Sequence, residues 1–304
     1  MPLRARRTIS LIRLLRAAGP LPRRRRMPRQ QQPDGIRLAY FNALDDAVCA
    51  RARAAFSRES HVIIADLRDL RAAQGKLDGD GRALAARRQD ADPPKPPPPG
   101  SQSAHARRAI DHAASRFAAA FHPKELHAVA RRFGEATAKH SRRELAKQLR
   151  AAVGVGLGQL ERPATDKIDE WAAENVDLIV TVPDRYFDRL RLDVEDAYGS
   201  GMHPDTLAAQ FEADYEVSRT DARRIARDQI GKLNGQLNQA RQEALGVTGY
   251  TWRTVRDNRV RNDHVDREGQ HFEWSDPPED GHAGTPVMCR CWADPDIDGL
   301  LAAL

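Results

Sequence analysis

The sequence predicts an α+β protein, with a mostly α-helical body followed by a small C-terminal module that contains a short antiparallel sheet. Apolar residues recur at intervals of three and four through most of residues 34–245, which is typical of packed helices. Aromatic residues make up only 6 % of the chain, which disfavours a large β-sandwich or barrel. After Gly246 the apolar pattern changes to a period of two, and Trp252, Trp274 and Trp292 all lie there.

These patterns divide the chain into five segments. We expect a basic disordered tail, an N-terminal helical region, a proline-rich linker, a helical domain and the C-terminal module, over residues 1–33, 34–91, 92–104, 105–245 and 246–304.

The tail carries an unusual share of the positive charge. The first 29 residues contain ten arginines and no acidic residue, and removing these ten from the 49 basic residues leaves fewer bases than the 43 acids. The net charge of +6 is therefore no evidence that the body binds nucleic acid. Arg13 and Arg16 interrupt the apolar run that an export signal would need. The tail is either an arm that contacts phosphates weakly or untranslated upstream sequence with the true start at Met27.

The helical body has several predicted boundaries. A helix is expected from Asp34, fading in the glycine-rich residues 74–81. Six prolines in residues 92–100 predict a stiff, exposed spacer. Pro123 is expected to open a helix, and the capping-box pattern of Ser141 and Glu144 predicts another helix start.

Two further boundaries are predicted in the second half of the body. The apolar run 178–182 is expected to end a helix before Pro183. A short helix from Pro204, a turn over residues 215–218 and a long helix over residues 219–244 together resemble a helix-turn-helix. This interpretation makes three arginines candidate DNA-binding residues, namely Arg223, Arg224 and Arg227. Interleaved acidic residues favour instead an ordinary helical hairpin whose surface charges pair with one another.

The C-terminal module contains three predicted strands. Residues 250–255, 272–274 and 287–293 alternate between apolar and polar, and a long loop over residues 276–286 precedes the third strand. The clustered tryptophans predict a compact core within the module.

The module also holds the chemically reactive side chains. Residues two apart on a strand face the same side, so Cys289 and Cys291 should point together, with β-carbons roughly 6–7 Å apart. A disulfide requires about 3.8 Å and hence a bend in the backbone, whereas convergence of both sulfurs on a zinc ion is easier. His264 or His282 would supply a nitrogen ligand. The alternative is two buried thiols that pack as small apolar groups beside a hydrogen-bonded His264.

A nucleophilic enzyme is a weaker interpretation of the same residues. Cys289 would be the nucleophile, His264 the base, and Asp257 or Asp263 the residue that orients it. No glycine-rich phosphate loop or paired-carboxylate motif accompanies them. With only three cysteines, two of them one residue apart, the chain has no secreted disulfide framework.

The order of these residues resembles a known family. The run Tyr250–Asp257, the spacing of Arg261 to His264, the glycine-rich loop 281–284 and the Cys289–Cys291 motif look like the C-terminal domain of phage Mu F-like head morphogenesis proteins. The residues that carry the resemblance as a structural motif are Trp252, Asp257, Arg261, Gly269, Gly281, Gly284 and Arg290. Residues 173–179, 186–188 and 224–234 are similar to the helical region that precedes that domain. Ala283 stands where the family is expected to have proline, and residues 1–26 have no counterpart.

The resemblance implies a minor head protein of a tailed phage or prophage, acting in head morphogenesis at the portal vertex and in DNA packaging or delivery. It implies no established catalytic activity. We expect no membrane span, because the longest stretch without charge, residues 151–160, is half of what a membrane helix needs, and we expect no small-molecule substrate. The expected partners are the portal protein, capsid or scaffold proteins and packaged double-stranded DNA, in the virion after assembly in the host cytoplasm. A DNA-binding packaging accessory factor and a metal-dependent hydrolase or nuclease that uses the His/Cys cluster are the alternatives, and zinc is the candidate cofactor.

Overall fold

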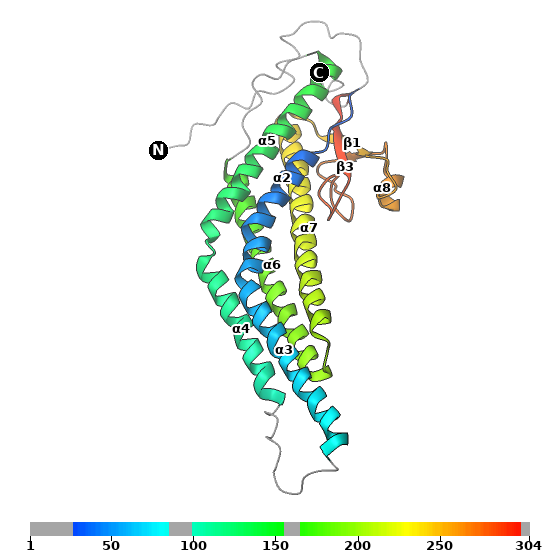
Figure 1. The fold of residues 1–304 in the computed structure, drawn as a ribbon. Coiled ribbons are helices and arrows are strands. Elements are labelled where there is room, and N and C mark those ends of the chain that lie inside the picture. Colours follow the sequence, from blue (N-terminus) through cyan, green and yellow to red (C-terminus); the bar gives the residue numbers. More distant parts are fainter. Residues whose placement is uncertain (1–26, 85–98, 155–164, 299–304) are drawn as a thin grey trace. The chain divides into compact units, whose positions relative to one another are not determined.

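The computed structural model describes residues 27–84, 99–154 and 165–298. Figure 1 shows long helices followed by a small sheet, which confirms the predicted fold class. In chain order the elements are α2 (Asp34–Leu44), a π-helical turn η1 (Asp45–Cys49), α3 (Ala50–Leu84), α4 (Pro99–Ala120), α5 (Pro123–Val153), α6 (Thr165–Ser200), α7 (Pro204–Ala244), β1 (Gly249–Thr254), α8 (Asn262–Asp266), β2 (His271–Glu273) and β3 (Cys291–Pro295). The predictions for residues 1–26 and for the prolines 93–98 concern residues outside those described.

The described residues form two compact units, each assembled from discontinuous segments. The first unit contains the described residues up to 41, those within 127–175 and those from 224 onward, including the described part of the C-terminal module. The second contains the described residues within 42–126 and 176–223. Helices α6 and α7 are long enough to contribute to both units.

Aromatic side chains form the core of the second unit. Phe56 on α3 contacts Tyr186 on α6 and Phe211 on α7 edge-on, with ring centroids 6.5 and 4.9 Å apart. Phe117 on α4 packs against Phe187 on α6 at 6.0 Å. These contacts join the four helices of the unit into one apolar core.

The helices of the first unit pack around Tyr40. Its ring lies 5.0 Å from Phe133 on α5 and 6.1 Å from Trp171 on α6, and its hydroxyl is 3.3 Å from Asn175 Oδ1. Gly134 on α5 allows the close approach of α6, because a β-carbon there would lie 2.8 Å from Ile168. A substitution at Gly134 would therefore push α5 and α6 apart.

Two predicted helix ends are wrong because the helices continue. Pro183 lies inside α6, where Thr181 donates a hydrogen bond to the Leu178 carbonyl and Arg185 donates to both oxygens of Thr181. These side-chain bonds support the backbone around the proline. Residues 74–81 continue α3, since glycine costs only about 1 kcal/mol per position in a helix and no proline stops it there.

The predicted turn over residues 215–218 is absent, because α7 runs without interruption from Pro204 to Ala244. Ser218 does not cap a new helix, because its hydroxyl donates to the Asp214 carbonyl one turn earlier. The sequence contains no glycine or proline from residue 205 to residue 230 that would break the helix. A helix-turn-helix requires two helices joined by a turn, so that interpretation of residues 204–244 is wrong.

Two other boundary predictions have different outcomes. Pro123 opens α5 as predicted. The capping-box prediction is wrong, because Ser141 and Glu144 lie in the middle of α5 and make long-range bonds. Ser141 Oγ accepts from Arg241, and Glu144 accepts from the backbone N–H of Gln31. Residues 99–104, assigned to the linker, form the start of α4.

The module contains a three-stranded antiparallel sheet in the order β2-β1-β3. Tyr250 pairs with Phe272, and Trp252 pairs with Ala293. The first two strand predictions are confirmed, but the third strand begins at Cys291 rather than at Val287. Met288 has a φ of 57°, and the Cys289 N–H donates to the Pro286 carbonyl, so a turn precedes the strand.

The module has the compact core that its tryptophans predict, and it is fastened to the helices of its own unit. Tyr250, Trp252 and Trp274 are the large side chains of the core. Asn238 and Gln242 on α7 both donate to the Ala293 carbonyl of β3, at 3.0 and 3.1 Å. No described helix is both long enough and apolar enough to cross a membrane.

Candidate metal centre

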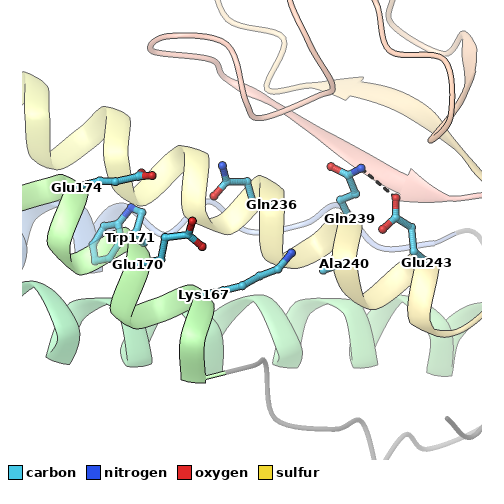
Figure 2. A pocket seen from close by; sticks show the side chains of 8 residues that line it. All are labelled: Lys167, Glu170, Trp171, Glu174, Gln236, Gln239, Ala240 and Glu243. Atoms are coloured by element: carbon cyan, nitrogen blue, oxygen red, sulfur yellow. Dashed lines mark hydrogen bonds between the residues drawn. The ribbon is translucent and has the colours of Figure 1, made fainter. Parts of the chain in front are cut away.

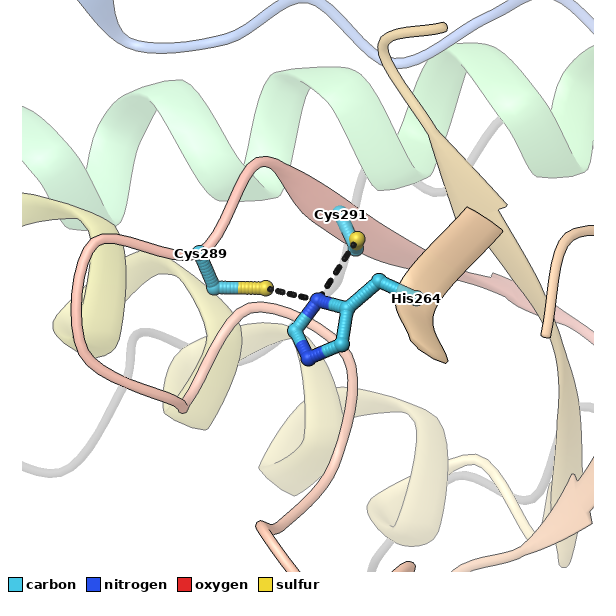
Figure 3. A group of neighbouring side chains, drawn as sticks. All are labelled: His264, Cys289 and Cys291. Carbon is cyan, nitrogen blue, oxygen red and sulfur yellow. Dashed lines mark hydrogen bonds between the residues drawn. The ribbon is translucent and has the colours of Figure 1, made fainter. Parts of the chain in front are cut away.

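Three side chains from separate parts of the module converge at one point (Figure 3). His264 lies on α8, Cys289 in the turn before β3, and Cys291 is the first residue of β3. The His264 Nδ1 atom is 3.6 Å from Cys289 Sγ and 3.4 Å from Cys291 Sγ. Both sulfurs therefore face His264, although Cys289 lies in a turn and not on the strand predicted over residues 287–293.

The surrounding fold fixes these positions. His264 is 1 % exposed and Cys291 4 %, while Cys289 is partly exposed. The His264 ring packs edge-on against Trp252 at 5.1 Å between centroids. The left-handed backbone at Met288 re-aims the chain, so that Cys289 reaches the histidine before the strand begins.

The second ring nitrogen of His264 also has a hydrogen-bond partner. Its Nε2 atom lies 2.7 Å from Asp280 Oδ2, and Arg267 donates to the other oxygen of Asp280 at 2.5 Å. Burial alone would raise the pKa of Asp280, but the bonds from His264 and Arg267 lower it, so the carboxylate stays ionised. Asp280 thereby fixes the ring orientation in which Nδ1 faces the sulfurs.

The two thiols have opposite acidities. Hydrogen bonding to Cys291 lowers the pKa of Cys289 to about 5, against the effect of burial and with help from His264. Interaction with Cys289 and burial raise the pKa of Cys291. The bond to Cys289 raises the pKa of His264, although burial opposes it. These shifts favour an ionised Cys289 thiol beside a His264 ring that takes up a proton more readily than a free histidine.

His282, the other predicted ligand, lies elsewhere. Its Nδ1 atom is 3.1 Å from the Tyr250 hydroxyl, and its ring packs edge-on against Trp274 at 4.9 Å. Burial lowers its pKa, which favours the neutral ring. His282 thus belongs to the aromatic core rather than to the cysteine cluster.

Asp280 is the site residue that the sequence did not reveal. The two acids considered as partners of His264 were Asp257 and Asp263. Asp257 instead pairs with Arg290, and the nearest oxygen of Asp263 is 3.8 Å from His264 Nε2. Asp280 is 16 residues from His264, inside an irregular loop without periodicity, so no local pattern links them.

A known protein family matches the part of the chain that contains this site. The family described as "Phage Mu protein F like protein" matches residues 188–293, which include His264 and both cysteines. Residues 188–293 are therefore similar to the phage Mu F-like family. The match confirms the resemblance predicted from the sequence.

A curated relative extends the comparison. A Haemophilus influenzae protein described as "Uncharacterized protein" is 35 % identical over 159 residues, which cover 51 % of this chain and 36 % of the relative. The aligned region thus spans about a third of that relative's length. No solved structure matches the chain.

The predicted motif residues of the Mu F-like region shape its turns and core. Trp252 is fully buried, Asp257 pairs with Arg290, and Arg261 donates to the Val287 carbonyl. Three motif glycines have positive φ, namely Gly269, Gly281 and Gly284. Gly284 also approaches α7 closely, because a β-carbon there would lie 3.3 Å from Gly235 Cα. These residues position the loop that carries Asp280 and Cys289.

The candidate DNA-binding arginines lie on the single helix α7. Arg223 and Arg224 are exposed, and Arg227 is half-buried. Since α7 is continuous, they form no separate reading helix.

A hollow in the first unit, separate from the His264 cluster, lies between α6 and α7 (Figure 2). Its lining mixes both charges and amides, with Lys167, Glu170, Glu174 and Glu243 among its residues. The buried Trp171 Nε1 atom finds no hydrogen-bond partner among the described residues. No sequence motif marks these residues as a site.

Proposed function

We propose that the protein is a minor head protein of a tailed phage or prophage that acts in head morphogenesis at the portal vertex and assists DNA packaging or delivery. The observation that carries this proposal is the family match over residues 188–293. The match spans helix α7 and most of the module, and is thus far more specific than a single motif.

The construction of the module supports an architectural part. Several of its polar side chains bond within the first unit: Asp257 pairs with Arg290, Glu268 accepts from the Thr254 N–H, and Asp294 accepts from Gln148 of α5. The last of these bonds, together with those from Asn238 and Gln242, fixes the sheet to α5 and α7. A module held this firmly suits a protein that joins other head components.

The proposed partners are the portal protein and capsid or scaffold proteins, with packaged double-stranded DNA as a further contact. The decisive experiment is co-purification of the full-length chain with the portal protein from the same phage. We expect the two to elute together. A chain that elutes alone, while remaining folded by circular dichroism, would contradict the portal-vertex role.

A metal-dependent hydrolase or nuclease is a second candidate, favoured by one observation. The His264 cluster provides three donors, and catalytic zinc sites typically have three protein ligands and one open position. The architectural proposal expects no hydrolysis of DNA or peptide substrates by the zinc-loaded chain. Hydrolysis that collapses in a folded His264→Asn variant would favour the enzyme instead.

A further inference from the structure

We propose that His264, Cys289 and Cys291 bind one zinc ion that clamps α8 to the start of β3, with Asp280 as the residue that orients the histidine. The proposal concerns the stability of the module and stands independently of the head-protein role. It rests on the positions of the donor atoms, their chemistry and the position of Asp280.

The donor spacing matches tetrahedral zinc coordination. With zinc–sulfur and zinc–nitrogen distances of about 2.3 and 2.05 Å, a tetrahedral angle places sulfur and nitrogen donors about 3.5 Å apart. The two observed separations from His264 Nδ1 are 3.6 and 3.4 Å. All three donor atoms lie within 4.8 Å of one another, which accommodates the sulfur–sulfur distance of about 3.8 Å around zinc. A single ion could therefore contact all three atoms with little movement of the fold.

The donor types select the metal. Two thiolates and one imidazole suit zinc, whereas calcium and magnesium require oxygen ligands. A second group, formed by Asp263, His264 and Asp280, offers two carboxylates and the opposite nitrogen of the same histidine. Its Asp280 is already neutralised by Arg267, and both acids are solvent-exposed. The sulfur-containing group is the stronger site.

Asp280 occupies the position that a carboxylate takes beside a metal-binding histidine. Histidines that bind metals through one nitrogen usually donate the other N–H to a carboxylate, which fixes the ring and makes the ligand more basic. His264 Nε2 lies 2.7 Å from Asp280 Oδ2, on the side of the ring away from the sulfurs. Arg267 holds the carboxylate in place through its second oxygen. Asp280 is thus a positioning residue and not a ligand.

A metal cross-link has a clear structural use here. The loop between β2 and β3 has no strand and no helix, and its backbone makes short local turns, such as the bonds from Gly281 to Pro278 and from Thr285 to His282. The sheet has three strands, one of them only three residues long. Small modules of this kind often need a metal or disulfides to remain folded. Zinc would tie α8, this loop and β3 together at one point.

The first test measures zinc in the full-length chain, purified under reducing conditions without a histidine tag. Elemental analysis should find about one zinc per chain. Cys289→Ser and Cys291→Ser should each lose it, while Cys49→Ser, which removes a buried thiol in the other unit, should retain it. Asp280→Asn should bind zinc with an affinity about 10–100-fold weaker.

The second test uses the wild-type chain and so does not depend on whether the variants fold. After chelation, cobalt(II) should bind with thiolate-to-cobalt charge-transfer absorption, and zinc should displace it. A folded wild-type chain that takes up neither metal would overturn the proposal. Zinc retained by the Cys289→Ser/Cys291→Ser double variant would overturn it as well, and so would an intact mass showing a Cys289–Cys291 disulfide in freshly purified protein.

Discussion

The C-terminal module and the second unit, whose described elements are helices, are stabilised in different ways. In the module, the structure depends on specific pairs of side chains: Trp252 packs on His264, and Asp257 pairs with Arg290. In the helical unit, aromatic contacts such as Phe56 with Phe211 form the core, and the surface carries ion pairs such as Arg53 with Glu212. The comparison suggests that the module tolerates substitution poorly, whereas most of the helical surface tolerates it well.

The largest expected effect is at Trp252. This side chain is fully buried in the module core and contacts both Phe272 and His264, so Trp252→Ala should destabilise the module by about 3–5 kcal/mol. Hydrogen exchange of peptides from residues 249–298 measures the local loss directly. Val265→Ala, at a position that is 51 % exposed on α8, is the matched control and should leave exchange almost unchanged. Equal protection in both variants would mean that the module does not depend on its aromatic core.

The module was also easier to predict from the sequence than the helices. The alternation around Trp252, the long loop and the Cys289–Cys291 spacing are strong local signals, and each corresponds to a feature of the structure. The helix boundaries predicted at Ser141, Pro183 and Ser218 were wrong because side-chain bonds, local at Pro183 and Ser218 and long-range at Ser141, outweigh the capping and breaking signals there. Ser141 illustrates this, since its hydroxyl accepts from Arg241, one hundred residues away.

The candidate site was predictable only in part. Two cysteines one residue apart would share a side of an extended chain, but Cys289 lies in the turn before β3, so the observed convergence also depends on the left-handed backbone at Met288. The choice between His264 and His282 could not be made, because it depends on how the loop folds back against Tyr250. The role of Asp280 depends on the same loop, and it became visible only in three dimensions.

Glycine substitutions in the module and in the helical unit should change stability in opposite directions. Gly284 in the module has a φ of 95° and lies against Gly235 of α7, so Gly284→Ala should cost about 1–3 kcal/mol. Gly199, inside α6, has open space around its missing β-carbon, so Gly199→Ala should stabilise its unit by about 0.5–1 kcal/mol. Hydrogen exchange in each region, measured at increasing urea concentration, distinguishes the two effects on stability. A stabilising Gly284→Ala would show that the loop can move away from α7.

The helical unit should show a pH dependence that originates at Asp193. Burial and a hydrogen bond with Asp214 raise the pKa of Asp193 to about 7, while Arg189 opposes the shift. Between the ordinary value of 3.8 and about 7, the folded chain holds a proton that the unfolded chain has released. The free energy of unfolding of this unit should therefore fall as the pH rises from about 4 to 7.

The matched variant for this effect is Asp193→Asn, which keeps the shape of the side chain and cannot ionise. Its unit should lose most of the decline in stability over that pH range, as followed by thermal unfolding at several pH values. A decline of the same size in the variant would assign the pH dependence to another group.

The smallest expected effect is at an exposed ion pair. Arg51 and Glu125 lie 3.4 Å apart, and both side chains are more than half exposed. Such pairs contribute about 0–1 kcal/mol, so Glu125→Gln should change the midpoint of thermal unfolding only slightly. A loss as large as that at Gly284 would contradict the view that the helical surface is tolerant.

The central claim, that the chain is a component of a phage head, is tested most directly by quantitative mass spectrometry of purified, DNA-filled particles from an induced lysogen. The account predicts peptides from residues 188–293 in the particles, at a few copies per portal ring. Their absence from particles that contain the portal protein, while the chain is abundant in the same lysate, would contradict it.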